Sequence, residues 1–217
     1  GDLAQPLLEA GQWLLFSLVT LAMVLLASEI TTIRLRLRER NGQLAELLER
    51  IQDLAVKDEL TGLYSRRHAM ELLAKACGQA RRGAFLLAVG FVDLDHFKRI
   101  NDRHGHLFGD QVLVRFAELT RRYLGDKDMA ARLGGEEFLI MLPVMDMEQA
   151  LTSVERLMSA LRAQRFMAAP ALEVTASVGL TVVGHGESPD EVLVRADRLL
   201  YQAKAAGRDR IITAGPP

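Results

Sequence analysis

The acidic side chains best placed for chemistry lie in two short segments. In RLGGEEFLIML (132–142), Glu136 and Glu137 stand beside two glycines at the start of an apolar run. In FVDLDHFKRINDRHGHLFGD (91–110), Asp93 ends an apolar run, and a second aspartate follows two residues later. Carboxylates this close repel each other, so both segments favour binding of a positive charge. Each pair alone is also typical of a solvated turn or a helix N-cap.

A shared sheet would bring these carboxylates together. If the strand before Asp93 lies beside the strand after Glu136, the two side chains converge on one point. Hard oxygen donors of this kind suit Mg²⁺ that is held jointly with the phosphates of a substrate. The glycines allow a tight turn and the close approach of a bulky ligand. The cations available for phosphate are Lys98, Arg132, Lys204 and Arg208, the last two spaced i,i+4 on the final predicted helix.

Alternating helices and strands must position these side chains. Helical periodicity and end signals, including Ser65 as an N-cap, predict helices at 66–82, 106–124, 147–166 and 188–207. Apolar or β-branched runs predict strands at 84–92, 129–133, 138–143, 172–183 and 209–214. The two strands around the glycine pair form a predicted hairpin. We therefore expect an α/β fold with a mixed, mostly antiparallel sheet flanked by helices.

The N-terminal part differs in composition from the rest. Residues 10–28 form an uncharged run of 19 residues, close to the ~20 that a helix needs to cross a bilayer. Four arginines follow at 34, 36, 38 and 40, which predicts a membrane-spanning helix with its C-terminal flank in the cytoplasm. The alternative is an apolar helix buried in a partner or a dimer.

A heptad pattern connects this run to the remainder. Ile30, Leu37, Leu44 and Ile51 recur every seven residues, and a second series, offset by three, contains Ile33, Arg40, Leu47 and Leu54. These are the core positions of a coiled coil, weakened in the middle by Arg40 and Gly42, so we expect a parallel dimer stalk. A single amphipathic helix on the domain surface is the alternative. The predicted divisions are residues 1–28, 29–57 and 58–217.

Composition excludes several classes of function. Half of the 217 residues are apolar, which is enough to bury a core, and the net charge of -1 offers no basic field for nucleic acid. Cys77 is the only cysteine, so neither an internal disulfide nor a cysteine-rich zinc site is possible.

Four motifs in order resemble the GGDEF-type diguanylate cyclases. They are DELTGLYSRR (58–67), FVDLDHFKRINDRHGHLFGD (91–110), RLGGEEF (132–138) and ADRLLYQAKAAGRDRI (196–211). The resemblance covers about residues 56–214 and implies a palm-like fold, similar to that of nucleotidyl cyclases. It also implies that two GTP molecules, one per subunit of a homodimer, are joined into cyclic di-GMP with release of pyrophosphate. With the N-terminal features it implies a bacterial inner-membrane protein whose catalytic domain is cytoplasmic.

The resemblance also implies roles for individual residues. Asp93, the Leu94 carbonyl, Glu136 and Glu137 would hold Mg²⁺ or Mn²⁺, with Glu136 the usual candidate for the base. Asn101 and Asp110 would bind the guanine edge, and Leu60 would pack against the base. The remaining substrate contacts would come from amides near Phe97, from His106, and from Lys98, Lys204 and Arg208, while Arg132 would stabilise charge at the reacting phosphorus.

The chain departs from the family pattern at two positions. Ser65 replaces an asparagine that is usual there, and serine is nearly equivalent as an N-cap. Many members also carry an inhibitory R-x-x-D site, for which Asp128 supplies the aspartate while Gly125 stands in place of the arginine. Glycine offers no guanidinium, so we expect that inhibitory site to be absent.

Three readings of the function follow. The first is an active cyclase, favoured because the chain keeps Asp93, Glu136 and Glu137. The second is an inactive receptor for GTP or cyclic di-GMP. A palm-type polymerase is disfavoured, since no further polymerase domains are present.

Overall fold

A six-stranded sheet organises the C-terminal part of the chain. In the computed structural model its strand order is β1-β3-β4-β2-β5-β6. The strands are β1 (Tyr64–Ser65), β2 (Leu86–Leu94), β3 (Met129–Gly134), β4 (Glu137–Val144), β5 (Ala176–Val182) and β6 (Ile211–Ala214). The three central pairings are antiparallel and the two edge pairings, β1 with β3 and β5 with β6, are parallel. The predicted mixed, mostly antiparallel sheet is therefore confirmed.

The structure describes residues 56–80, 83 and 85–215, and a scattered set between 18 and 40. The chain divides into two units, Gly1–Leu54 and Ala55–Pro217. In the first unit, the described residues are helical, and Ile30, Ile33 and Leu37 are 43%, 51% and 54% exposed. Most of the predicted membrane segment and the second half of the heptad pattern lie outside the described residues. Within the described part of the chain, no helix is both long enough and apolar enough to span a bilayer.

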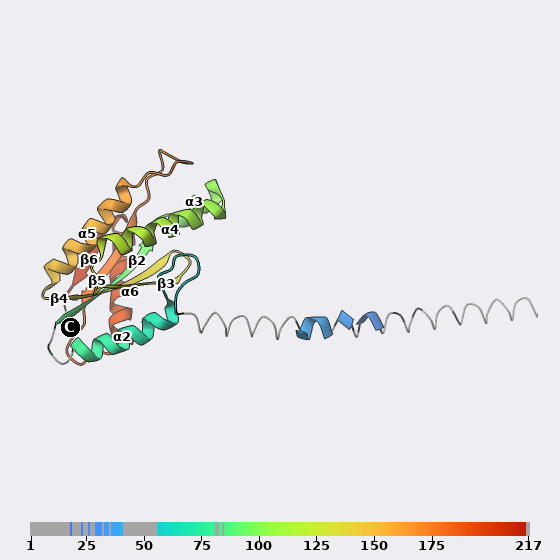
Figure 1. The fold of residues 1–217 in the computed structure, drawn as a ribbon, viewed down its shortest axis with the longest axis horizontal. Coiled ribbons are helices and arrows are strands. Elements are labelled where there is room, and N and C mark those ends of the chain that lie inside the picture. The colour runs from blue at the N-terminus through green and yellow to red at the C-terminus, as the bar shows by residue number, and fades with distance from the viewer. Residues whose placement is uncertain are drawn as a thin grey trace, which may run out of the picture. The chain divides into compact units, whose positions relative to one another are not determined.

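Helices cover both faces of the sheet, and they also differ in detail from the sequence prediction (Figure 1). They are α2 (Arg66–Ala80), α3 (Phe97–His104), α4 (His106–Tyr123), α5 (Met147–Ala163) and α6 (Pro189–Ala205). Residues 81 and 82, at the predicted end of α2, lie outside the described residues. The short helix α3 was not predicted.

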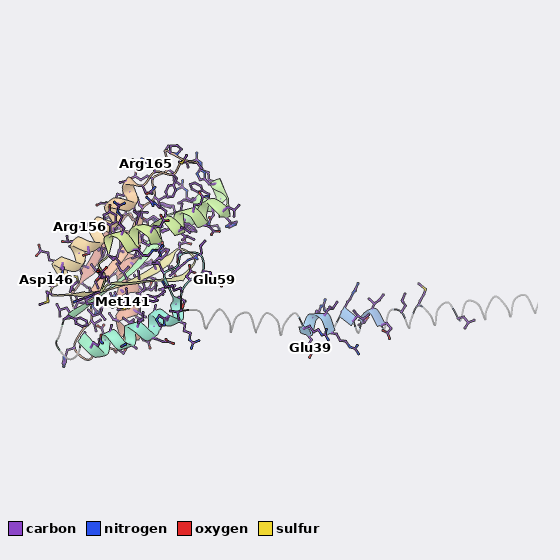
Figure 2. The ribbon with its side chains drawn as sticks, in the orientation of Figure 1. Glu39, Glu59, Met141, Asp146, Arg156 and Arg165 are labelled. Carbon is purple, nitrogen blue, oxygen red and sulfur yellow. The ribbon has the colours of Figure 1, made fainter. Side chains whose placement is uncertain are left out.

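Successive side chains of each strand point to opposite faces of the sheet, so an apolar core forms on each face. Ala88 and Val92 of β2 face α4 and α5, whereas Leu87 and Val89 face α2. On β5, α6 packs so closely that a Cβ at Gly179 would lie 2.1 Å from the carbonyl oxygen of Ala196. In Figure 2, Met141 on β4 lies inside the unit while Arg156 and Arg165 lie at its periphery. The sheet is thus rigidly held, and its strand ends are fixed relative to α6.

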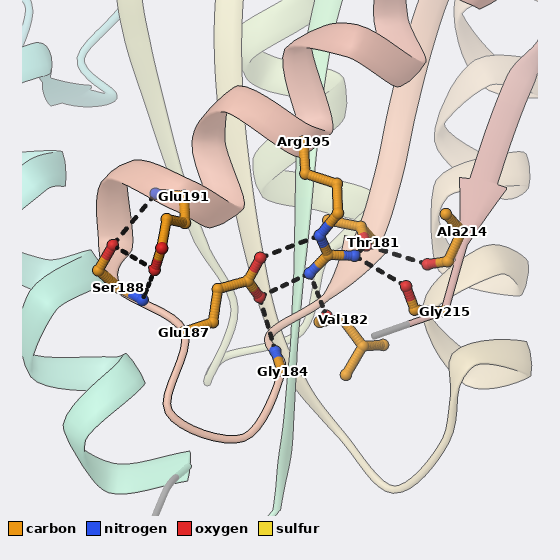
Figure 3. Close-up of polar contacts among 9 residues, drawn as sticks. All are labelled: Thr181, Val182, Gly184, Glu187, Ser188, Glu191, Arg195, Ala214 and Gly215. Carbon is orange, nitrogen blue, oxygen red and sulfur yellow. Dashed lines mark hydrogen bonds and ion pairs between the residues drawn. The ribbon is translucent and has the colours of Figure 1, made fainter. Parts of the chain in front are cut away.

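A buried guanidinium fixes the start of α6 (Figure 3). Arg195 forms a two-pronged ion pair with Glu187, at 2.9 and 2.6 Å, and both side chains are largely buried. It also donates to the hydroxyl of Thr181 and, at 2.8 Å each, to the carbonyls of Val182 and Gly215. All five guanidinium N–H groups are therefore used to join β5, the loop after it and the end of β6.

We expect Arg195→Ala to lower the free energy of unfolding by about 3–5 kcal/mol, because Glu187 is left as a buried charge without its cation. Urea denaturation measures the loss. Arg198→Ala, on the exposed side of the same helix, is the control and should change stability by less than about 0.5 kcal/mol. A loss below about 1 kcal/mol for Arg195→Ala would contradict this assignment.

Candidate active site

The glycine pair lies where β3 turns into β4, with Gly134 ending β3 and Gly135 and Glu136 in the turn. Gly134 and Gly135 have φ angles of 144° and 53°, which L side chains rarely adopt, and the register shifts between Arg132 and Gly134. Beyond the turn, Glu137 pairs directly with Asp93 across β4 and β2. The Leu94 amide donates to the Glu136 carbonyl at 3.2 Å. The structure thus brings the two acidic segments together at one end of the sheet.

Negative charge is concentrated at this point. Burial raises the pKa of Asp93, although the Lys204 ammonium, 2.7 Å from its carboxylate, opposes the shift. The pKa of Glu136 is also raised, first by burial and then by the charges of Asp93 and Glu137. Raised pKa values on converging carboxylates mark a site whose ionised form is stabilised when a cation binds.

The donor set fits a metal that is shared with a substrate. Among the described residues, no group of three or more histidine, cysteine, aspartate or glutamate side chains is arranged to hold a metal ion. Magnesium is usually bound through one or two carboxylates plus substrate phosphates, and Asp93 with Glu136 meets that requirement. Glu137 and the carbonyl of Leu94 are the neighbouring oxygen donors predicted from the sequence.

The junction of α3 and α4 holds a candidate contact for a donor group of a ligand. Asn101 Oδ1 is the one buried side-chain polar atom in the described part of the chain that lacks a hydrogen-bond partner. A Cβ on Gly109 would lie 1.9 Å from this oxygen, so only glycine leaves room for the Asn101 side chain in this position. Asp110 follows on the same helix and is partly buried. An unpaired buried acceptor is costly, which indicates that a ligand donates to it.

The other predicted substrate contacts come from α3, from the start of α4 and from the segment before β1. Leu60 is partly buried against the core, and Phe97 is 5% exposed with its ring beside Gly109 and Asn101. The amides of Arg99 and Ile100 donate to the His96 carbonyl at the N-cap of α3. The amides of Phe97 and Lys98 precede these first helical hydrogen bonds and are suited to phosphate. Lys98 and His106 are exposed.

The Arg132 side chain makes two contacts at the turn, one with a backbone carbonyl and one with a carboxylate. Its Nε and Nη2 atoms donate to the Gly135 carbonyl at 3.0 and 2.8 Å, and Nη1 lies 3.4 Å from the Asp58 carboxylate. Asp58 in turn accepts from the amide and hydroxyl of Thr61. These contacts hold the turn in shape, while the role of Arg132 at the reacting phosphorus stays a prediction. The Asp58 partner was missed, although the Asp-x-x-Thr spacing is a capping signal.

Arg208 is not on α6, contrary to the sequence prediction. The helix ends at Ala205, and Gly207 follows with a φ angle of 110°. Arg208 and Lys204 therefore do not share a helix face, but both cations act on Asp93 and oppose the rise in its pKa. Asp95, which the sequence offered as a second acid, is instead 4% exposed and hydrogen-bonded to Thr175, Ser177 and Asp209.

The position of the family's inhibitory site is occupied by a local turn. The amide of Gly125 donates to the Asp128 carboxylate at 2.6 Å, and the amide of Asp128 donates to the Gly125 carbonyl at 3.0 Å. Burial raises the pKa of Asp128. The side chain of Arg121 is near but donates to the Thr61 carbonyl at 2.8 Å. The Asp128 carboxylate is therefore already hydrogen-bonded within the turn formed by residues 125–128.

Comparison with known proteins identifies the family. Residues 55–210 match the family described as "Diguanylate cyclase, GGDEF domain". The chain belongs to this family. Diguanylate cyclase DgcP of Pseudomonas aeruginosa is 37% identical over 82% of the chain, and response regulator PleD of Caulobacter vibrioides is 37% identical over 76%. These alignments cover 29% and 37% of the two relatives, so the chain spans about a third of the curated relatives it matches. Proteins of the family generally use a divalent metal.

Solved structures agree with this assignment and with the fold. The coiled coil and GGDEF domain of DgcB from Caulobacter crescentus, in complex with c-di-GMP, matches 84% of this chain and 99% of its own. Its TM-score is 0.70 at 31% identity. The active GGEEF domain of a Vibrio cholerae diguanylate cyclase matches 69% of this chain and 96% of its own, with a TM-score of 0.65 at 31% identity. The predicted cyclase-like palm is confirmed.

Proposed function

We propose that this chain condenses two GTP molecules into cyclic di-GMP. Each 3′-hydroxyl attacks the α-phosphorus of the other nucleotide, so two phosphodiester bonds form and two pyrophosphates leave. The observation that carries the proposal is the acidic cluster at one end of the sheet. There Asp93 pairs with Glu137 across β2 and β4, burial and then the charge of Asp93 raise the pKa of the adjacent Glu136, and Lys204 forms an ion pair with Asp93. Family membership and the intact acidic turn support the same activity.

The chain's own residues divide the chemistry between them. Asp93 and Glu136, with Glu137 and the Leu94 carbonyl nearby, would hold Mg²⁺ or Mn²⁺. Such an ion, when bound, neutralises phosphate charge and makes a nearby hydroxyl more acidic. Glu136 would accept the hydroxyl proton, and its raised pKa, which makes it a stronger base than an ordinary carboxylate, supports this role. The cations that bind and orient the triphosphate are Lys98, Lys204 and Arg208.

Guanine recognition rests on Asn101 and Asp110. The Asn101 amide offers an acceptor and a donor, and the Asp110 carboxylate accepts from the ring N–H and the exocyclic amine. The free Oδ1 of Asn101 supports this assignment, because it needs a donor that the described part of the chain does not provide.

We expect Asn101→Ala and Asp110→Ala to reduce discrimination between GTP and ATP by roughly 10–100-fold. The reason is that a site built to bond one base edge rejects another base through unpaired polar groups. Competition between GTP and ATP for the purified protein measures the ratio, with Asp102→Ala on the exposed side of α3 as the control. Unchanged discrimination in both variants would reject the assignment.

The reaction needs two subunits to face each other, because each would bind one GTP and the product contains two. The N-terminal unit could hold these two subunits together. We propose that a parallel coiled coil over 29–57 joins two subunits, with the exposed Ile30, Ile33 and Leu37 in its seam. We further propose that residues 1–28 cross the bacterial inner membrane and leave the cyclase domain in the cytoplasm. The DgcB structure is of a coiled coil with its GGDEF domain, which supports the stalk.

An inactive receptor for GTP or cyclic di-GMP is the alternative. One relative that is 38% identical over 73% of the chain is named a cyclic di-GMP phosphodiesterase, so family membership alone does not fix the activity. Incubation of the purified chain with GTP and Mg²⁺, followed by chromatography, separates the two functions. Cyclic di-GMP supports the cyclase, whereas GTP that binds but stays intact supports the receptor.

Product feedback through the inhibitory position should be weak. A bidentate charged hydrogen bond contributes about 1.5–3 kcal/mol, so a chain with Gly125 should bind product there roughly one to two orders of magnitude less tightly. Calorimetric titration with cyclic di-GMP and initial rates with added product measure this. Submicromolar binding together with strong non-competitive inhibition would overturn the expectation.

The converse substitution, Gly125→Arg, should create that inhibition. A Cβ at Gly125 would make ordinary contact, 3.4 Å, with the Asp128 carboxylate, so the turn accepts a side chain. Gly125→Lys is the matched control because it adds charge without a bidentate fork.

A further inference from the structure

The loop after α6 has an unusual backbone. Three successive residues have positive φ angles, namely 110° at Gly207, 64° at Arg208 and 45° at Asp209. Glycine adopts this conformation freely, but two further residues with side chains do so only when their surroundings hold them there. Such local strain is common where a side chain must be aimed at a functional site.

Two contacts from distant parts of the chain hold this loop. Asp95, at the end of β2, accepts from the amide of Asp209 at 3.0 Å. Arg162, in the last turn of α5, donates from Nε to both carboxylate oxygens of Asp209 at 2.8 and 2.9 Å. Asp95 is itself fixed by the hydroxyls of Thr175 and Ser177, each at 2.7 Å.

The held loop carries a cation toward the carboxylates of the site. The amide of Arg208 donates to the Ala203 carbonyl at 3.0 Å, and the Arg210 carbonyl accepts from Val178 at 2.9 Å. Arg208 is therefore anchored before and after its own position. It follows the end of α6 by three residues, and Lys204 in the last turn of α6 lies 2.7 Å from the Asp93 carboxylate. The charge of Arg208 also opposes the rise in the pKa of Asp93.

We propose that Arg162, Asp209 and Asp95 form a brace that positions Arg208 to bind the triphosphate of GTP. The three are positioning residues, because they act through Arg208 and lie outside the predicted substrate contacts. The inference rests on the proposed function. A purely structural brace would change stability but would leave the preference for a triphosphate over a monophosphate unchanged.

The test compares two ligands in the presence of Mg²⁺. One is 3′-deoxy-GTP, which lacks the attacking hydroxyl, and the other is GMP, which lacks the β- and γ-phosphates. Arg162→Ala should weaken binding of 3′-deoxy-GTP about tenfold, as expected for one misplaced charged contact, and change GMP binding less than about twofold. Arg162→Lys should restore part of the loss. Arg67→Ala removes an exposed ion pair with Glu71 on α2 and should change neither affinity.

A double-mutant cycle shows whether Arg162 acts through Arg208. In an Arg208→Ala background, Arg162→Ala should cause almost no further loss, because the positioned group is already gone. The brace would be overturned if the affinity losses of Arg162→Ala and Arg208→Ala were fully additive. It would also be overturned if Arg162→Ala weakened binding of 3′-deoxy-GTP and GMP equally. If the unmodified protein bound neither ligand, the proposed function would fail as well, whereas normal wild-type binding with an unaffected Arg162→Ala variant would reject the brace alone.

Discussion

Glu136→Gln should reduce the rate of cyclic di-GMP formation at least tenfold, and by about 10²–10³ if the charge acts mainly in the transition state. Glutamine keeps the size of the side chain but removes the negative charge that would hold the metal and the group that would accept the proton. The residue is on a surface turn and half-buried, so the fold should persist. Initial rates at saturating GTP and Mg²⁺ measure the effect.

The same variant should be at least as stable as the wild type without metal. Glu136 is partly desolvated and repelled by Asp93 and Glu137, so its neutral replacement removes an unfavourable charge. Thermal unfolding in a chelating buffer measures the stability of both proteins without metal. Glu155→Gln, on the exposed side of α5, is the control for both measurements. A Glu136→Gln enzyme that kept more than a tenth of the wild-type rate would show that the metal assignment is wrong.

Removal of residues 1–55 should lower the rate per subunit by about 10²–10³ at micromolar protein. The proposed coiled coil would hold two domains at an effective concentration near millimolar, and without it the two domains would have to meet by diffusion. The remaining unit has its own two-sided core and should still bind one GTP. The rate per subunit, measured across a series of protein concentrations, should rise with concentration.

Fusion of the shortened domain to an unrelated parallel dimeric coiled coil should restore the rate. Fusion to a monomeric helix of equal length is the matched control. A concentration-independent rate equal to that of the longer chain would mean that the globular domain dimerises without help from the N-terminal unit.

Periodicity predicted the long elements because each has a clear buried face. The eight-residue helix α3 was missed, since only Phe97 and Ile100 are buried among charged neighbours. Strand β1 has only two residues, which is too short for an alternating pattern in the sequence. It is a strand because it pairs with β3. Its partners lie more than 60 residues away, beyond the reach of any local pattern.

The site was partly predictable for the same physical reason. Strand ends in one sheet must lie near each other, so Asp93 and Glu136 could be brought together from the sequence alone. The contact of Arg132 with Asp58 spans 74 residues and needed the fold. The error at Arg208 had a local signal, because Gly207 ends the helix through its positive φ angle and the i,i+4 spacing then no longer applies.

The most direct test of the cyclase proposal is the stoichiometry of the reaction. The purified full chain is incubated with GTP and Mg²⁺, and nucleotides and pyrophosphate are quantified together over time. Two pyrophosphates released for each cyclic di-GMP, with turnover blocked by 3′-deoxy-GTP, is the result we predict. Intact GTP in the presence of demonstrable GTP binding, or guanosine diphosphate and phosphate as the products, would contradict the proposal.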